Sequence, residues 1–365
     1  MNIKTNIALD TIAPYVPGKP IDAVKRELGL TDVIKLASNE NPLGCSEKAK
    51  KAVIQALEQA ALYPDSNFTD LRQKLAAQFG LLPTQFFFGA GSDGIIEMIP
   101  HAFLNHGDQA VMSATTFPLY QTNTKIAGGQ CVIVPLDADY CYDLDAMAAK
   151  ITPKTKIVWL CNPNNPTGTT YSKAAQEKFL AQVPHDVLVV IDEAYYEYVA
   201  QDDFPDSLAL LEQYPNIIIL RTFSKIYGLA SMRIGYAIAH PDIIAALEKV
   251  RGPFNVSTLA QVAALASLDD PDFLQHSINH NAQNLQFLVK QFTQMGLKCL
   301  PSATNFVMVN TGVDSRVLFP QLLQKGVIVR PGHLYGMDTF LRISVGTLSE
   351  CQTCVQALQD CLAEL

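Results

Sequence analysis

The sequence lacks long hydrophobic runs. Its longest apolar stretches, residues 187–191 and 217–220, have the length of a buried strand, whereas a membrane-spanning helix needs about 20 apolar residues. Residues 1–10 also lack the apolar centre of a signal peptide. From these absences we expect a cytoplasmic protein that has no membrane partner.

The sequence also has no internal repeat, no low-complexity segment and no excess of positive charge. It contains 27 Lys and Arg against 35 Asp and Glu, a net charge of −8, and 48% of its 365 residues are hydrophobic. This composition excludes a disordered chain, and the length corresponds to about two domains. The mildly acidic balance argues against a nucleic-acid partner but is compatible with a local anion site.

Closely spaced cysteines are scarce. The 8 cysteines are scattered through the chain, which is typical of reduced thiols. Only Cys351 and Cys354 have the C-x-x-C spacing, and they lie in a predicted helix with no second pair and no histidine close by. We therefore predict no metal site.

From about residue 46 to residue 245, helical patterns alternate with short apolar runs. These runs are apolar throughout, which is typical of strands buried on both faces. We therefore predict an α/β fold, a mostly parallel central sheet with helices on both faces, in which ligands bind at the carboxyl ends of the strands. The expected helices cover residues 46–61 and 68–79 and a segment ending at 104, and the expected strands cover residues 86–88, 110–112, 131–135, 157–161, 187–191, 217–220 and 234–239.

The last third of the chain has a different pattern, with long helices followed by short strands. It predicts a smaller α+β domain. Pro14, Pro17 and Pro20 indicate an irregular N-terminal segment. We expect an arm over residues 1–30 that joins the small domain, a large domain over 31–245 and a small domain over 246–365. The expected helices of this last part cover residues 241–251, 258–268 and 272–295 and a segment from 349 onward, and its expected strands cover 306–309, 327–330 and 340–345.

A glycine motif, residues 89–94, fits G-x-G-x-x-G between a strand and a helix. Backbone N–H groups and the helix dipole at such a helix start favour a phosphate. A dinucleotide site also needs an acidic residue about 20 positions on, at the end of a second strand. Asp108 comes too soon and precedes its strand. A phosphate other than a dinucleotide is therefore favoured, and a plain tight turn stays possible.

Polar residues follow three of the predicted strands. The loop at residues 162–168, which contains Asn165, comes after one strand, Asp192 after the next, and Lys225 after a third. Because the carboxyl ends of parallel strands meet at one edge, we expect these side chains to converge there. Each has a simpler alternative: a surface turn, a helix cap and a solvated lysine.

The chemistry of these residue types fits an aldehyde cofactor. A buried carboxylate such as Asp192 needs a cationic partner, and a protonated ring nitrogen supplies one. A lysine at the mouth of a site bonds to an aldehyde when its amine is partly unprotonated. Near Lys225, Thr222 and Ser224 offer hydroxyls, and Arg233 offers a guanidinium for a phosphate.

Together these motifs resemble those of the pyridoxal 5′-phosphate (PLP) aminotransferases of fold type I, the group of aspartate aminotransferase. Within it, the chain is most similar to the histidinol-phosphate aminotransferases. The segments that carry this narrower resemblance span nearly the whole chain in the family's order: residues 14–20 (PYVPGKP), 36–44 (LASNENPLG), 63–65 (YPD), 329–332 (VRPG) and 341–347 (LRISVGT).

The resemblance implies roles around the cofactor ring. Lys225 resembles the lysine that attaches the cofactor and shuttles the proton. Asp192 resembles the partner of the pyridine nitrogen, and Tyr195 and Asn165 resemble the donors to the phenolic oxygen of the ring. Phe117 matches the aromatic residue that stacks on the ring; a core aromatic is the alternative for it.

The resemblance also implies a phosphate site and a shared active site. Ser92, Asp93, Ser224 and Arg233 match the residues around the cofactor phosphate, and Tyr63 matches a tyrosine that reaches it from the second subunit of a homodimer. Gly94 departs from the family, which commonly has an acidic residue there. A side-chain hydrogen bond near the phosphate is therefore in doubt, whereas backbone contacts are not affected.

For the substrate, the resemblance implies that Arg342 binds an α-carboxylate. Tyr15 and Arg330 match positions near the far phosphate of the substrate; a core aromatic is the alternative for Tyr15. The implied reaction is reversible, ping-pong transamination between histidinol phosphate and 2-oxoglutarate in histidine biosynthesis. Two alternatives stay open: an aromatic amino acid aminotransferase of the same subgroup, and a PLP-dependent decarboxylase of phosphorylated threonine.

Overall fold

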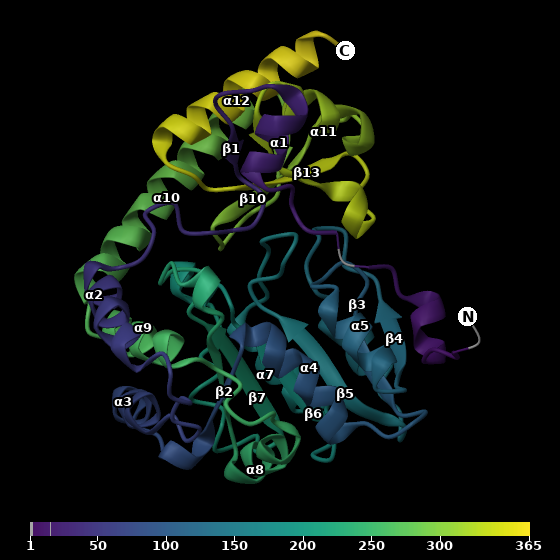
Figure 1. Cartoon of the computed structure of the whole chain (residues 1–365). Helices are drawn as coiled ribbons and strands as arrows, with labels where there is room; N and C mark the ends of the chain where they lie inside the picture. Colours follow the sequence, from purple (N-terminus) through teal and green to yellow (C-terminus); the bar gives the residue numbers. More distant parts are fainter. Residues whose placement is uncertain (1–2, 15) are drawn as a thin grey trace.

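The computed structural model describes residues 3–14 and 16–365. Tyr15, which the sequence predicts to be a substrate ligand, lies outside the described residues. Figure 1 shows the two parts of the molecule, one built around a large sheet and the other formed by the C-terminal residues above it. Among the described helices, none is both long and apolar enough to cross a membrane.

The larger part contains a seven-stranded sheet, and this confirms the predicted fold class. The spatial order is β2 (Phe86–Gly89), β8 (Gly235–Ala239), β7 (Ile217–Thr222), β6 (Leu188–Asp192), β5 (Thr155–Cys161), β3 (Gln109–Ser113) and β4 (Gln130–Val134). Most of these strands run parallel, and only β8 is antiparallel to its neighbours. Strands β2, β6, β7 and β8 are buried along their whole length, as expected of a sheet covered on both faces.

Helices cover this sheet in groups. One group comprises α4 (Gly91–Phe103), α5 (Leu119–Ile126) and α8 (Pro241–Val250), and another comprises α6 (Leu144–Ala148) and α7 (Lys173–Leu180). A further group packs α2 (Glu47–Ala56) and α3 (Thr69–Phe79) against α9 (Thr258–Leu268). Ser46 caps α2, as its sequence position suggests, because its hydroxyl accepts a hydrogen bond from the Ala49 N–H.

The C-terminal part has its own sheet and core. The sheet order is β12 (Arg330–Pro331), β13 (Phe340–Ser344), β10 (Phe306–Asn310) and β9 (Lys298–Cys299), with α11 (Ser315–Gln324) and α12 (Leu348–Ala363) packed on it. Helix α10 (Pro271–Gln294) joins the two parts: its Leu274 packs on the core of the large sheet, and its Phe292 belongs to the C-terminal core. The sequence predicts one strand over residues 327–330, but the structure has two strands there. The first, β11 (Val327–Ile328), pairs with β1 (Ile34–Lys35), and the second, β12, pairs with β13.

The expectation of an irregular N-terminal segment is wrong for residues 21–28. Helix α1 (Ile21–Leu28) begins directly after Pro20 and ends at Gly29, whose φ of 68° closes the helix. Ile21, Val24 and Leu28 recur at helical spacing, so the periodicity indicates a helix, and the three prolines before it are the reason for the irregular expectation. Only Val24 is buried. Val24 packs with Leu323 and Ile328, and α1 therefore lies with the C-terminal part (Figure 1). The domain boundaries stay a prediction.

Candidate active site

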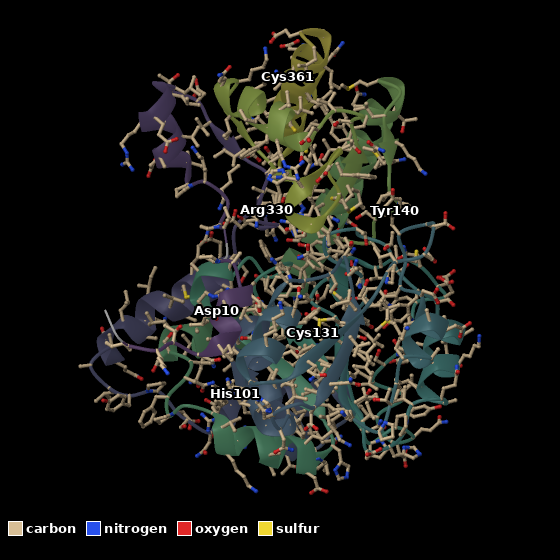
Figure 2. All side chains as sticks on the ribbon, turned by 90° about the vertical axis from the view of Figure 1, so that its right-hand side faces the viewer. Asp10, His101, Cys131, Tyr140, Arg330 and Cys361 are labelled. Carbon is tan, nitrogen blue, oxygen red and sulfur yellow. The ribbon has the colours of Figure 1, made fainter. Side chains whose placement is uncertain are left out.

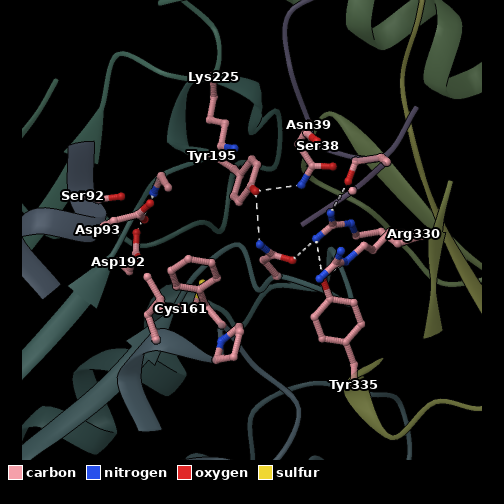
Figure 3. Close-up of a pocket in the computed structure, with 18 residues that line it drawn as sticks. Ser38, Asn39, Ser92, Asp93, Cys161, Asp192, Tyr195, Lys225, Arg330 and Tyr335 are labelled. Atoms are coloured by element: carbon pink, nitrogen blue, oxygen red, sulfur yellow. Dashed lines mark hydrogen bonds between the residues drawn. The ribbon is translucent and has the colours of Figure 1, made fainter. Parts of the chain in front are cut away.

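A cavity of about 360 Å³ lies between the two parts, at the carboxyl ends of β5, β6 and β7. Figure 2 places Arg330 at this junction, and Figure 3 shows the side chains that line the cavity. From the C-terminal part, Arg330 and Arg342 line it. The predicted residues that line it from the large sheet are Ser92, Asp93, Phe117, Asn165, Asp192, Tyr195 and Lys225.

Asp192 is the last residue of β6 and is 3% exposed. Its Oδ2 accepts a hydrogen bond of 2.6 Å from the Tyr120 hydroxyl, and its Oδ1 accepts one of 3.1 Å from the Ala194 N–H. Burial raises the pKa of this carboxyl to about 6, and the bond from Tyr120 opposes the rise. A cation placed in the cavity beside Asp192 would stabilise its ionised form.

Lys225 follows β7, and its side chain points into the cavity (Figure 3). Burial lowers the pKa of its amine to about 8, and the positive charge of Arg342 acts in the same direction. A substantial fraction of the amine is therefore neutral near pH 8, as a nucleophile or a general base requires. The Nζ atom lies 5.6 Å from the centre of the Tyr195 ring.

One end of the cavity forms an anion cradle at the first turn of α4. Ser92 and Asp93 lie there, and the Arg233 guanidinium donates to Asp93 Oδ2 at 3.1 Å and to Ser224 Oγ at 3.4 Å. A Cβ at Gly91 would approach Arg233 Nη2 to 2.7 Å, so a side chain there would collide with the guanidinium. Free backbone N–H groups, two hydroxyls and an arginine are the donor set that a phosphate monoester needs.

Gly94, also in the first turn of α4, leaves room for a side chain. A Cβ at this position would lie 3.4 Å from the nearest atom, Ala90 Cβ. Nothing in the structure explains the glycine.

Tyr195 and Asn165 meet through hydrogen bonds. The Tyr195 hydroxyl accepts from Asn165 Nδ2 at 3.4 Å and from Asn39 Nδ2 at 2.9 Å. Arg342 Nη1 in turn donates to Asn165 Oδ1 at 2.6 Å. Burial raises the pKa of the Tyr195 phenol well above its usual range, so the phenol keeps its proton as a donor toward the cavity.

Arg330 and Arg342 stand directly opposite each other on β12 and β13. They are 6% and 5% exposed. Arg342 Nη2 donates to the Ala37 carbonyl at 2.8 Å, and Arg330 Nη1 donates to the Val16 carbonyl at 2.6 Å. Both also donate to the Tyr335 hydroxyl. Two buried guanidinium groups at one end of the cavity make this end suitable for anions.

Phe117 and Tyr63 have different surroundings. Phe117 lines the cavity and contacts Tyr120 edge-on, with ring centroids 5.7 Å apart. Tyr63 does not line this cavity. Its residue is 81% exposed, and its ring stacks on Phe254 at 4.5 Å.

Asn39, Tyr120 and Tyr335 hydrogen bond to side chains of the site but are not among the site residues that the sequence predicts. Asn39 lies in segment 36–44, and this position is its sequence signal; in the structure it has a left-handed φ of 56°, a conformation that asparagine tolerates. Tyr120 lies in α5, three residues after Phe117, which precedes the helix; the Tyr120 N–H donates to the Phe117 carbonyl at 3.3 Å, and this turn brings the two rings into contact. Tyr335 has no local signal, because it reaches the site only through tertiary packing.

Comparison with known proteins identifies the family. The family model described as "Aminotransferase class I and II" matches residues 31–358. The chain belongs to this family. It is 48% identical over 96% of its length to the histidinol-phosphate aminotransferase of Caldicellulosiruptor saccharolyticus and covers 98% of that protein. It is 50% identical over 95% of its length to the enzyme of the same name from Brevibacillus brevis and covers 95% of that protein.

Solved aminotransferases have the same fold. The histidinol-phosphate aminotransferase of Sinorhizobium meliloti in complex with PLP has a TM-score of 0.91 at 31% identity, over 99% of this chain and 98% of that one. The aspartate aminotransferase of Thermus thermophilus has a TM-score of 0.86 at 23% identity, over 98% of this chain and 100% of that one, and shows the fold alone. The chain is therefore a PLP-dependent transaminase with an aspartate-aminotransferase-like fold.

The residues of the cavity fit PLP. The cradle at α4 matches a phosphate, the buried Asp192 matches a protonated ring nitrogen, and the amine of Lys225 matches an aldehyde. The aromatic face of Phe117 provides a surface against which a ring stacks. These assignments follow from the chemistry of the donors and acceptors that the cavity brings together.

Proposed function

We propose that this transaminase moves the amino group of histidinol phosphate to 2-oxoglutarate, reversibly and by a ping-pong sequence, in histidine biosynthesis. One observation of the site carries the proposal: two buried arginines, Arg330 and Arg342, face each other at one end of the cavity. An acceptor with two carboxylates needs such a pair of cations, and an amino donor with a far phosphate needs one of the two. The names of the relatives at 46–50% identity support the same substrate. We also propose a cytoplasmic location.

The chemistry divides among the residues around the cavity. PLP supplies the electron sink for the electrons of the substrate Cα–H bond. Asp192, ionised, holds the ring nitrogen as a cation. The amine of Lys225 accepts the proton from Cα as a general base and returns it as an acid, which its pKa of about 8 allows. Tyr195 and Asn165 donate toward the phenolic oxygen of the ring.

The two arginines serve the two half-reactions differently. Histidinol phosphate has no α-carboxylate, so Arg342 acts mainly on glutamate and 2-oxoglutarate, whose α-carboxylate it orients. Arg330 binds the far phosphate of one substrate and the far carboxylate of the other. A substrate panel tests this assignment: histidinol phosphate, phenylalanine, tyrosine and O-phosphothreonine, compared by kcat/KM. Histidinol phosphate should rank first, and a higher value for an aromatic amino acid or release of CO₂ from O-phosphothreonine would replace the proposal.

We further propose a homodimer in which Tyr63 completes the active site of the second copy. Around Tyr63 the surface is apolar and exposed: Leu62 is 69% exposed and Phe254 42%, and both line the same surface hollow as Tyr63. An exposed cluster of this kind is typical of a protein interface. The Tyr63 ring stacks on Phe254, and no hydrogen bond to its hydroxyl is found among the described residues.

Mixed dimers test the shared site. Tyr63→Ala and Lys225→Ala chains, each nearly inactive alone, are unfolded together and refolded. If Tyr63 acts across the interface, one site of each mixed dimer has both an intact Lys225 and an intact Tyr63, so roughly a quarter of all sites should recover activity. No recovery, with mixed dimers verified by mass, would reject the arrangement.

A further inference from the structure

Arg330 and Arg342 form a like-charged pair that needs a group between them. In an antiparallel ladder, residues in register point to the same face, and these two are register partners. Both are nearly buried, where repulsion between cations is stronger than in water. Among the described residues, no carboxylate oxygen lies within 4.0 Å of the Arg342 guanidinium. Neutral oxygens must therefore hold Arg342 in place.

The Tyr335 hydroxyl is the one described oxygen to which both arginines donate. It lies 3.1 Å from Arg342 Nη1 and 3.4 Å from Arg330 Nε. The guanidinium carbons lie 5.7 Å and 6.0 Å from the centre of the Tyr335 ring. Figure 3 shows Tyr335 pointing toward Arg330 from the side of the cavity opposite to Asp192.

The turn that carries Tyr335 is held firmly. Tyr335 ends the short helix η6 (Gly332–Tyr335), and Gly336, with a φ of 73°, reverses the chain directly after it. A Cβ at Gly332 would lie 2.3 Å from the Met337 carbonyl oxygen, so the turn is packed against its own return strand. The His333 N–H donates to Ser315 Oγ at 3.1 Å and ties the turn to α11. The phenol oxygen is therefore preorganised.

The proton of this hydroxyl is available to a ligand. A phenol oxygen accepts at most two hydrogen bonds and donates one. The two arginines, which only donate, fill its acceptor positions, and no acceptor for its proton is found among the described residues. In addition, the buried Nε of Arg342 has no partner among them. The hydroxyl of Tyr335 and the Nε of Arg342 thus each have a proton without an acceptor among the described residues, and both residues line the cavity.

We propose that Tyr335 is a substrate-positioning residue of this transaminase. Its hydroxyl fixes the distance between Arg330 and Arg342 and donates its proton to the anionic group that Arg330 binds, which is the far phosphate of the donor or the far carboxylate of the acceptor. The inference deepens the proposed function and rests on it for the identity of the phosphate. The dicarboxylate likewise comes from the proposed function, and the two buried arginines in register support it.

The first test is binding of glutarate, an unreactive five-carbon dicarboxylate, to the PLP-loaded enzyme by calorimetry. Tyr335→Phe removes the hydroxyl and keeps the ring beside both guanidinium groups. A hydrogen bond between a neutral donor and a charged group corresponds to roughly a tenfold change in affinity or more, so Kd should rise about tenfold. Tyr140→Phe is the matched control, because no hydrogen bond to the Tyr140 hydroxyl is found among the described residues and its ring packs on Phe340 outside the cavity.

The second test separates positioning from a general structural role. In Tyr335→Phe, KM for histidinol phosphate should rise about tenfold with kcat within a factor of two, whereas kcat/KM for histidinol, which lacks the phosphate, should not change. Equal losses for both amino alcohols, or a Kd for glutarate within a factor of two of the unmodified enzyme, would overturn the inference. If histidinol phosphate is not a substrate but glutarate binding still depends on Tyr335, the substrate proposal fails and the role of Tyr335 stands.

Discussion

Replacing Tyr120 by phenylalanine should make the stability of the cofactor-free enzyme more sensitive to pH. Tyr120 is fully buried, and its ring stacks on Trp159 with centroids 4.7 Å apart. Its hydroxyl donates to Asp192 Oδ2 at 2.6 Å. The substitution keeps the ring and its packing and removes only the hydrogen bond to the carboxylate.

The magnitude follows from the charge of the acceptor. A hydrogen bond to a charged group contributes about 1.5–3 kcal/mol to stability, and one to a neutral group about 1 kcal/mol. Loss of the hydroxyl therefore penalises the ionised form of Asp192 by roughly 1.4 kcal/mol more than the protonated form, which is about one pKa unit. The pKa of Asp192, about 6 in the native enzyme, should rise to about 7.

The sign of the pH effect is set by the raised pKa. Native Asp192 binds its proton more tightly than the unfolded chain does, so the free energy of unfolding falls as pH rises from about 3.8 to about 6. In Tyr120→Phe the fall should continue to about pH 7. At pH 5 the carboxyl is mostly protonated in both proteins, whereas at pH 8 it is ionised in both. The variant should therefore lose about 1.4 kcal/mol more at pH 8 than at pH 5.

Urea unfolding of the cofactor-free protein at pH 5 and pH 8 measures this difference. Tyr142→Phe is the control, because Tyr142 is buried like Tyr120 but its hydroxyl hydrogen bonds to a neutral group, the Thr116 hydroxyl, at 2.6 Å. Its loss of stability should be the same at both pH values. An equal loss at pH 5 and pH 8 in Tyr120→Phe would show that the hydroxyl does not tune the Asp192 carboxyl, and the reasoning would be refuted.

Three further predictions concern residues that we propose to bind the cofactor. Because burial lowers the pKa of Lys225 from 10.5 to about 8, the stability of the cofactor-free enzyme should rise between those pH values, and Lys225→Met should flatten that rise in urea unfolding. Asp192→Asn should still bind PLP by its absorbance but exchange the substrate Cα proton about 10³-fold more slowly, a barrier increase of roughly 4 kcal/mol; near-normal exchange by NMR would leave Asp192 a structural role. Arg233→Ala should weaken PLP binding at least about tenfold, measured by equilibrium dialysis, and unchanged binding would remove Arg233 from the phosphate site.

The half of the site that belongs to the large sheet is predictable from the sequence. Asn165, Asp192 and Lys225 lie at or just beyond the ends of buried strands with apolar centres, and the carboxyl ends of parallel strands meet at one edge of a sheet. The glycine motif before α4 is equally local, because a phosphate cradle needs only a strand, a tight turn and a helix start. The structure places all of these residues at one cavity.

The other half depends on packing that no local pattern encodes. Strands β1, β11 and β12 have two residues each. Periodicity in such short elements is too weak to predict their pairing. Their packing nevertheless decides that Val16, Ala37 and Asn39 reach the arginines and Tyr195. The resemblance of segments 36–44 and 341–347 to a family indicated the importance of this region, but it left Asn39 and Tyr335 without a role.

The hydrogen bonds between the two halves make the substrate site and the cofactor site one unit. Arg342 comes from the C-terminal sheet and donates to Asn165 of the large sheet, and Asn165 donates to Tyr195. Asn39 holds the same Tyr195 hydroxyl and is itself held by Ser344, two residues after Arg342 on β13. A shift of β13 relative to the large sheet therefore disturbs Tyr195, the proposed donor to the ring oxygen, and Arg342 at the same time. For this reason, substitutions at the junction of the two halves should alter the substrate affinity and the absorbance of the bound cofactor together.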